Sequence, residues 1–149
     1  HWPGVTDTGA ATDVPAITTD LYPTLLDVAG LQKRPDEHVD GTSLAPVLKG
    51  RSALDRDALF WHYPHYSNQG GFPGGAVRRG PWKLVEDYRD GSVQLFNLER
   101  DLGEQTNVAN RHPERVTRLR TRLHDWYEEV DARFLRATEN GPDPWRPGE

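Results

Sequence analysis

The sequence predicts an α+β fold in which a small antiparallel sheet of three to four strands is packed by a long C-terminal helix. Two patterns carry this prediction. Residues 58–98 hold short aromatic and alternating runs separated by turn signals, which is typical of antiparallel strands. Residues 113–134 repeat apolar side chains at steps of three and four, which places them on one helical face. Because a sheet of this size needs a covering element, we expect the helix to pack on it.

Composition limits the classes of partner. The chain has 149 residues, of which 35% are hydrophobic and 28% charged, and its net charge is −5. Phosphate binding needs a concentrated basic surface, so we expect no nucleic acid partner. No apolar run approaches the roughly 20 residues of a membrane span, so we expect no membrane partner. The absence of cysteine excludes disulfides, zinc ribbons and thiol nucleophiles from these residues and leaves the cellular compartment open.

The first predicted element is a short helix within residues 13–30, DVPAITTDLYPTLLDVAG. Thr19 or Asp20 is suited to cap its start, and Pro23 fits the first turn, where a missing N–H is tolerated. Gly30 is suited to end it in the left-handed conformation. Because its apolar stripe is wide, we expect this helix to be well buried. The stripe consists of Leu21, Leu25 and Val28.

The next segment, residues 31–57, is rich in proline, glycine and charge and predicts irregular structure. Leu44, Val47 and Leu48 are expected to form one helical turn that holds the segment to a core. We place a soft boundary near Gly50.

Four short runs predict the strands. ALFWHY is aromatic and is stopped by Pro64, while GAVRR and WKLVEDY flank a turn at residues 79–81. Asp90-Gly91 is a hairpin signal between two alternating runs. These runs predict a meander of three or four strands.

The covering helix is expected to begin at Pro113, a residue suited to the first helical position. Its arginines are expected mostly on the outer side among acidic partners, and Trp145 is expected to pin the tail that follows. The predicted apolar face consists of Val116, Leu119, Leu123, Trp126, Tyr127, Val130 and Phe134, and the arginines are Arg115, Arg118, Arg120 and Arg122.

Two sets of acidic residues invite a metal-binding interpretation. In the first set, the residues are Asp13, Asp20 and Asp27, spaced by seven. Only Asp20 and Asp27 share the predicted helix, about 10 Å apart along its axis, so capping and surface charge are favoured over metal binding. The second set is denser but lacks a third well-spaced ligand group. This second set consists of Asp36, Glu37, His38 and Asp40. No serine lies in a nucleophile elbow, and the glycines of residues 70–80 lack the ending of a phosphate-binding loop.

The stretch WHYPHYSNQGGFPGG, residues 61–75, concentrates aromatic and imidazole side chains. Imidazole and phenol both donate hydrogen bonds near neutral pH, which suits sulfate, phosphate or sugar hydroxyls. The candidate substrate-binding residues are His62, His65 and Tyr66, and Arg78 and Arg79 are candidates for added positive charge. The alternative is that these aromatics are half-buried and hydrogen-bonded at a sheet edge.

Six blocks, taken in order, resemble the C-terminal end of type I, formylglycine-dependent sulfatases, which include the arylsulfatases and belong to the alkaline phosphatase superfamily. The blocks are DLYPTLLDVAG, DGTSLAPVLKG, LFWHYPHYS, AVRRGPWKLV, QLFNLERDLGEQTNVA and PERVTRLRTRLHDWYEE. The resemblance implies that residues 1–50 are the end of an alkaline-phosphatase-like α/β domain, with its last strand at HWPGV and its last helix. Residues 51–149 would be the antiparallel C-terminal subdomain.

The resemblance also implies what lies elsewhere. The family nucleophile comes from a C/S-x-P-S-R motif, which this chain lacks, and the calcium ligands and catalytic lysines and histidines are expected upstream of His1. We therefore expect no catalytic residue, metal site or cofactor in this segment, and calcium and formylglycine in the full-length enzyme.

The implied function is hydrolysis of aryl or carbohydrate sulfate esters by the parent enzyme, with this segment forming one side of the substrate cleft and inactive alone. His62, His65 and Tyr66 would then recognise the group that bears the sulfate. The alternatives are a fragment of a related phosphodiesterase or phosphonate hydrolase, and a stand-alone carbohydrate-binding module. The expected partners are the N-terminal catalytic part and a sulfated small molecule or glycan. Self-association is also expected, to cover the apolar face of the first helix.

Overall fold

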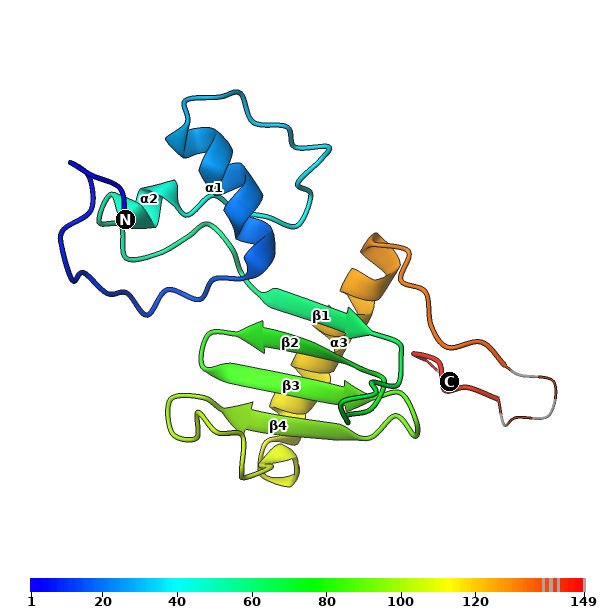
Figure 1. The fold of residues 1–149 in the computed structure, drawn as a ribbon. Helices are drawn as coiled ribbons and strands as arrows, with labels where there is room; N and C mark the ends of the chain where they lie inside the picture. Colours follow the sequence, from blue (N-terminus) through cyan, green and yellow to red (C-terminus); the bar gives the residue numbers. More distant parts are fainter. Residues whose placement is uncertain (138, 140, 142, 149) are drawn as a thin grey trace. The chain divides into compact units, whose positions relative to one another are not determined.

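The computed structural model describes residues 1–137, 139, 141 and 143–148. They form two compact units, an N-terminal unit, His1–Arg56, and a C-terminal unit that begins at Asp57. Figure 1 shows the chain as a ribbon. No helix in the described part of the chain has both the length and the apolar character needed to cross a membrane.

The C-terminal unit is built on a four-stranded antiparallel meander (Figure 1), which confirms the predicted sheet. The strands are β1 (Leu59–Tyr63), β2 (Gly74–Arg79), β3 (Trp82–Asp87) and β4 (Val93–Asn97), in the order β1-β2-β3-β4. Gly80 lies in the turn between β2 and β3 with φ +56°, a left-handed conformation that glycine adopts without steric cost.

Helix α3 (Pro113–Glu129) covers one face of this sheet (Figure 1), as predicted. Three of its side chains are buried in a core shared with β2, β3 and β4, and Trp126 stacks on Phe60 of β1 with ring centroids 4.9 Å apart. The helix-to-sheet core includes Leu119, Leu123 and Tyr127 from the helix and Val77, Leu84 and Leu95 from the strands.

Helix α3 ends at Glu129, so the prediction that it continues to Phe134 is wrong. Asp131 adopts φ +49°, and the amide of Ala132 donates to the carbonyl of Tyr127 at 2.9 Å. This is the bonding of a Schellman end, which reverses the chain after the helix. Phe134 then packs on the Tyr127 ring from outside the helix, with centroids 5.1 Å apart. Its helical spacing in the sequence therefore reflects core packing rather than helix continuation.

The described tail returns to the sheet through Trp145, as predicted. The indole stacks on the ring of Tyr88, with centroids 5.5 Å apart and planes 11° apart. It also lies against Gly91, where a Cβ atom would overlap the indole ring. The glycine in the β3–β4 turn thus leaves room for the tail as well as turning the chain.

The N-terminal unit contains a 3-10 turn (Thr18–Asp20), helix α1 (Leu21–Val28) and the single turn α2 (Ala45–Leu48). The last two elements were predicted, and Gly30 ends α1 with φ +67°. Residues 1–16 contain no helix or strand. The expected strand at HWPGV is a turn instead, closed by hydrogen bonds from Val5 and Thr6 to the carbonyl of Trp2.

Helix α1 is not buried in the way its apolar stripe predicts. Leu21 is 54% exposed and Leu25 is 64% exposed, whereas Pro23 and Thr24 are buried. The Thr24 hydroxyl donates to the Asp20 carbonyl at 2.6 Å and accepts from the Leu44 amide at 2.8 Å. The buried side of the helix therefore carries Pro23 and Thr24, and it is held to the unit partly by the hydrogen bond from the Leu44 amide to Thr24. Self-association through the exposed leucines stays a prediction.

Asp20 is the polar centre of the N-terminal unit. It is fully buried, with Oδ1 2.7 Å from Arg56 Nη1 and 2.9 Å from the Thr42 amide, and Oδ2 2.9 Å from the Ile17 amide. Burial by itself raises the pKa of Asp20, but these hydrogen bonds outweigh it and hold the pKa below its usual value. Of the two favoured roles, surface charge is wrong for Asp20, which is an internal brace. Asp20 does occupy the N-cap position of α1, as predicted, although its side chain makes no cap hydrogen bond to that helix and instead accepts from the Ile17 amide at the start of the 3-10 turn.

Replacing Asp20 by Asn is expected to lower the free energy of unfolding by about 1–3 kcal/mol, because an amide carries no charge for Arg56 and has one oxygen fewer to accept hydrogen bonds. Asp13→Asn, at an exposed position, is the matched control and should change it by less than about 0.5 kcal/mol. Chemical denaturation measures both. Equal stabilities of the two variants would contradict the bracing role.

Candidate functional site

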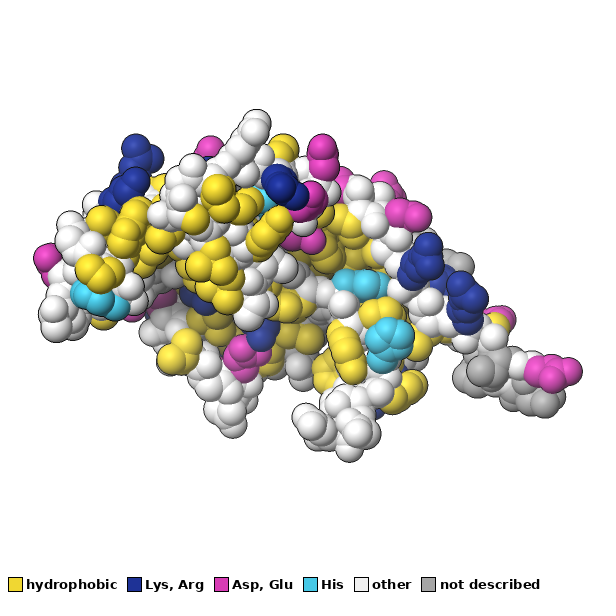
Figure 2. Space-filling view, turned by 45° about the horizontal axis from the view of Figure 1, so that its top comes forward, with side chains coloured by type: hydrophobic (Ala, Val, Ile, Leu, Met, Phe, Trp, Pro, Cys, Tyr) yellow, Lys and Arg dark blue, Asp and Glu magenta, His cyan; other side chains and the backbone are white. Residues whose placement is uncertain are grey.

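The predicted site residues lie around the connection between β1 and β2, residues 64–73, which we call the aromatic loop. His65 and Tyr66 are exposed in this loop, Tyr66 with 68% of its surface open to solvent. The ring of Tyr63 meets His65 edge to face, with centroids 5.5 Å apart. The loop therefore presents an imidazole and a phenol to solvent side by side in the sequence. Figure 2 shows histidine side chains at the surface beside hydrophobic ones.

His62 does not join His65 and Tyr66. It lies on β1 opposite Gly75, half-buried, and its side chain points to the face covered by α3. Its Nδ1 is 2.7 Å from the hydroxyl of Tyr88, and its Nε2 is 2.8 Å from the carbonyl oxygen of Arg133. Both ring nitrogens thus have partners within the protein. For His62, the local geometry is the half-buried, hydrogen-bonded arrangement that was the alternative to a binding role.

These contacts assign the proton on His62. A carbonyl oxygen only accepts, so Nε2 carries a hydrogen and donates it to Arg133. Burial lowers the pKa of His62 below its usual value, with a smaller opposing effect from the Arg133 carbonyl. The neutral ring therefore leaves Nδ1 as an acceptor, and the hydroxyl of Tyr88 donates to it.

A buried polar cluster continues from His62 into the sheet–helix interface. The hydroxyls of Tyr88 and Tyr127 are 2.7 Å apart. Beyond them, Glu86 is fully buried, with Oε1 2.7 Å from Arg120 Nε and 2.9 Å from His124 Nε2. Burial raises the pKa of both tyrosines, so both hydroxyls keep their protons. The expectation that the helix arginines lie on the outer side is wrong for Arg120, which turns inward to pair with Glu86.

Gly75 makes room for this cluster. A Cβ atom at Gly75 would overlap the hydroxyl groups of both Tyr127 and Tyr88. The φ angle of Gly75 is not in the left-handed region, so the glycine is required by close approach of side chains rather than by backbone conformation.

Arg78 and Arg79 do not add charge to the aromatic loop. They lie at the end of β2 that is farthest from it, about 13–16 Å away at strand spacing, and Arg79 pairs with Asp57. The basic residue at the loop is Arg89, whose guanidinium lies 4.9 Å from the centre of the Phe72 ring and pairs with Asp87 at 2.6 Å. The sequence could have indicated Arg89 by its place in the β3–β4 hairpin turn. Because β2 and β3 are antiparallel, the end of β3 lies beside the start of β2, where the aromatic loop ends.

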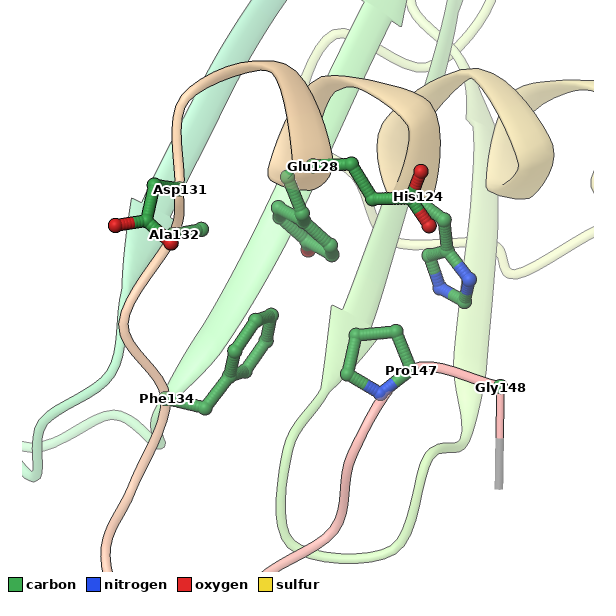
Figure 3. A pocket seen from close by; sticks show the side chains of 8 residues that line it. His124, Glu128, Asp131, Ala132, Phe134, Pro147 and Gly148 are labelled. Carbon is green, nitrogen blue, oxygen red and sulfur yellow. The ribbon is translucent and has the colours of Figure 1, made fainter.

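A hollow of about 310 Å³ lies beside the polar cluster, at the end of α3 (Figure 3). Figure 3 shows His124, Phe134 and Pro147 around it, with the carboxylates of Glu128 and Asp131 at its margin. The described residues include no group of three or more His, Asp or Glu side chains able to hold a metal ion.

In the acidic set of residues 36–40, Glu37 bonds to ordinary partners. It accepts from the Tyr22 hydroxyl at 2.7 Å and from Arg34 Nη1 at 3.1 Å. These bonds are those of a surface charge.

The lowered pKa of His62 predicts a pH effect on stability. Between the usual imidazole pKa near 6.5 and the lower folded value, the unfolded chain binds more protons, so the free energy of unfolding falls as the pH drops through this window. The slope of the free energy of unfolding against pH gives the number of protons taken up on unfolding. Between pH 7.5 and 5, we expect His62→Gln to lower this number by up to one, and exposed His65→Gln is the control. Denaturation at several pH values measures the slope. An unchanged slope in His62→Gln would refute the assignment of a buried neutral ring.

Comparison with known proteins identifies the family. A family model described as N-sulphoglucosamine sulphohydrolase, C-terminal, matches residues 1–132. A sulfatase of Formosa agariphila is 34% identical over 140 residues, which are 84% of this chain and 25% of that protein. Arylsulfatase K of Mus musculus is 37% identical over 112 residues, which are 68% of this chain and 20% of that protein. This chain thus spans a quarter or less of the length of these relatives.

Solved structures agree in fold. The structure of Ps i-CgsB in complex with k-i-k-neocarrahexaose matches with a TM-score of 0.68 and 26% identity, over 93% of this chain and 30% of that one. A structure described as a 2-O GAG sulfatase matches with a TM-score of 0.65 and 25% identity, over 76% of this chain and 25% of that one. The predicted resemblance to the C-terminal portion of sulfatases is confirmed. This chain belongs to the N-sulphoglucosamine sulphohydrolase C-terminal family.

Proposed function

We propose that this chain is the C-terminal portion of a sulfatase that hydrolyses aryl or carbohydrate sulfate esters. The family match over residues 1–132 carries the proposal, and the sulfatase and arylsulfatase relatives support it. In this proposal the segment forms one side of the substrate cleft, and the bond is cleaved by groups in the rest of the parent protein.

The two parts of the segment have different proposed origins. Residues 1–50 are assigned to the end of the α/β catalytic domain, and residues 51–149 to the antiparallel C-terminal subdomain. The catalytic part of the same protein is then the main partner. The exposed leucines of α1 support this assignment, because a helix of the catalytic domain would present its apolar side to that domain.

The aromatic loop is the proposed recognition surface for the group that carries the sulfate. His65 and Tyr66 are exposed and can donate hydrogen bonds to sulfate or sugar oxygens. Arg89 lies at the same end of the sheet, but its guanidinium is already paired with Asp87. His62 stays a predicted contact, but a ligand would have to displace the Arg133 carbonyl or the Tyr88 hydroxyl from its ring. A sulfated glycan is the proposed ligand class: the structure of Ps i-CgsB in complex with k-i-k-neocarrahexaose supports a glycan, and the sulfatase relatives support the sulfate.

Calcium and formylglycine are proposed for the full-length enzyme, as the family implies. The chain holds no C/S-x-P-S-R nucleophile motif. Its described residues also supply no cluster of carboxylates that fits a calcium ion. The chemistry that these groups supply is electrostatic stabilisation and nucleophilic attack on the sulfate ester. The proposed contribution of this segment is to bind and orient the substrate.

Replacing His65 by Ala in the full-length enzyme tests the recognition role. We expect kcat/KM on a sulfated oligosaccharide to fall about tenfold, the usual effect of losing one hydrogen bond to a charged group. On a small aryl sulfate it should change less than about twofold, because the proposed recognition surface contacts the larger group that carries the sulfate, which such a substrate lacks. Gln94→Ala, exposed on β4, serves as the control. Unchanged kcat/KM on both substrates would refute the role of His65.

A further inference from the structure

We propose that Tyr88 is the positioning residue of the aromatic loop, because from one point in the core it binds both the strand that leads into the loop and the last residue of the loop. On β1, two residues before the loop, His62 Nδ1 lies 2.7 Å from the Tyr88 hydroxyl. At the end of the loop, the Tyr88 amide donates to the carbonyl oxygen of Pro73 at 2.9 Å. The last strand pair that closes the loop, Tyr63 with Gly74, lies next to these two bonds.

Tyr88 is itself held rigidly. Its side chain is 1% exposed, and its ring packs against four others, including that of His62 at 5.5 Å. Trp145 stacks on it, Phe134 lies edge to face at 5.1 Å, and the Tyr127 hydroxyl is 2.7 Å from its own. A phenol confined in this way has one available position for its hydroxyl, so the His62 ring and the start of the loop are fixed with it.

The neighbours of Tyr88 in the sequence strengthen the attachment at the end of the loop. The guanidinium of Arg89 lies over the Phe72 ring, 4.9 Å from its centre. Asp87 orients this guanidinium by accepting from Nη2 at 2.6 Å and from Nε at 3.0 Å. Asp87 is 8% exposed. The three consecutive residues Asp87, Tyr88 and Arg89 thus link the loop to the sheet through side chains and backbone together.

The bond to His62 depends on the Tyr88 side chain, whereas the bond to Pro73 does not. Tyr88→Phe therefore removes one of the two hydrogen bonds of the His62 ring, keeps the bond to Arg133, and leaves the end of the loop attached. Tyr127→Phe provides a matched control, because it removes a buried hydroxyl from the same cluster. A phenol has a single hydrogen, and a neutral His62 ring that donates from Nε2 needs that hydrogen at Nδ1. We infer that Tyr88 accepts from Tyr127, so the Tyr88–His62 bond survives in that variant.

Hydrogen exchange of the full-length parent protein measures the loop directly. In Tyr88→Phe, amides in the peptide spanning residues 59–76 are expected to exchange about tenfold faster than in the wild type, the effect of losing one buried hydrogen bond. Amides of β4 should be unchanged. In Tyr127→Phe, residues 59–76 should exchange within about twofold of the wild type. Unchanged exchange in Tyr88→Phe, or equal acceleration in β4 and the loop, would overturn the positioning role.

Any effect of Tyr88 on catalysis rests on the proposed function, in which the loop binds substrate. Kinetic measurements separate that proposal from the positioning role of Tyr88. If the loop binds substrate, Tyr88→Phe should raise KM for a sulfated oligosaccharide about fivefold, with kcat on a small aryl sulfate unchanged. In a His65→Ala background the same change should raise KM less, because the contact that it positions is already lost. Faster loop exchange with unchanged KM would support the role of Tyr88 and refute substrate binding by the loop.

Discussion

A buried carboxylate determines how the C-terminal unit is put together. Glu86 is fully buried on β3, and a carboxylate in that position is strongly unfavourable unless it is paired and hydrogen-bonded. Arg120 and His124 meet this need from one turn of α3. The pairing therefore favours one register of the helix over the sheet, since sliding it by a turn would leave at most one of the two partners beside Glu86. Apolar burial favours packing of the helix, and this polar pairing selects its position.

The same cluster connects the core to the aromatic loop. Tyr127 and Tyr88 lie between Glu86 and His62, and Gly75 leaves the space that their hydroxyls occupy. In the sequence, His62 looks like a site residue because it is two residues before the loop. In the structure, it is bonded to Tyr88 and Arg133 and links the loop to the core. His65 and Tyr66 then extend to solvent from a base that these hydrogen bonds hold to the core. A rigid base with exposed donors suits recognition of an extended polar ligand, which needs its contacts held in place before binding.

Much of the fold was predictable from the sequence, and the failures have physical causes. Period-two runs and Asp90-Gly91 identified the sheet, because strands and turns are set by local preferences. The helix was predicted too long because Phe134 keeps the helical spacing while packing from outside the helix. The buried ion pair of Glu86 and Arg120 could not be recognised from the sequence, because residue type alone does not distinguish a buried charged side chain from an exposed one. Two of the predicted site residues, His65 and Tyr66, lie exposed in the aromatic loop, and their role in substrate binding stays a prediction. Strand alternation places the third, His62, on the face opposite Tyr63.

The most direct test of this account is the free energy of unfolding of Glu86→Gln. We expect a loss of about 2–4 kcal/mol, somewhat less than for a fully buried pair because Arg120 is 37% exposed. Glu104→Gln removes the partner of Lys83, a part-exposed pair, and should cost less than about 1 kcal/mol. A loss for Glu86→Gln no larger than that for Glu104→Gln would contradict the claim that the buried carboxylate sets the packing of the helix on the sheet.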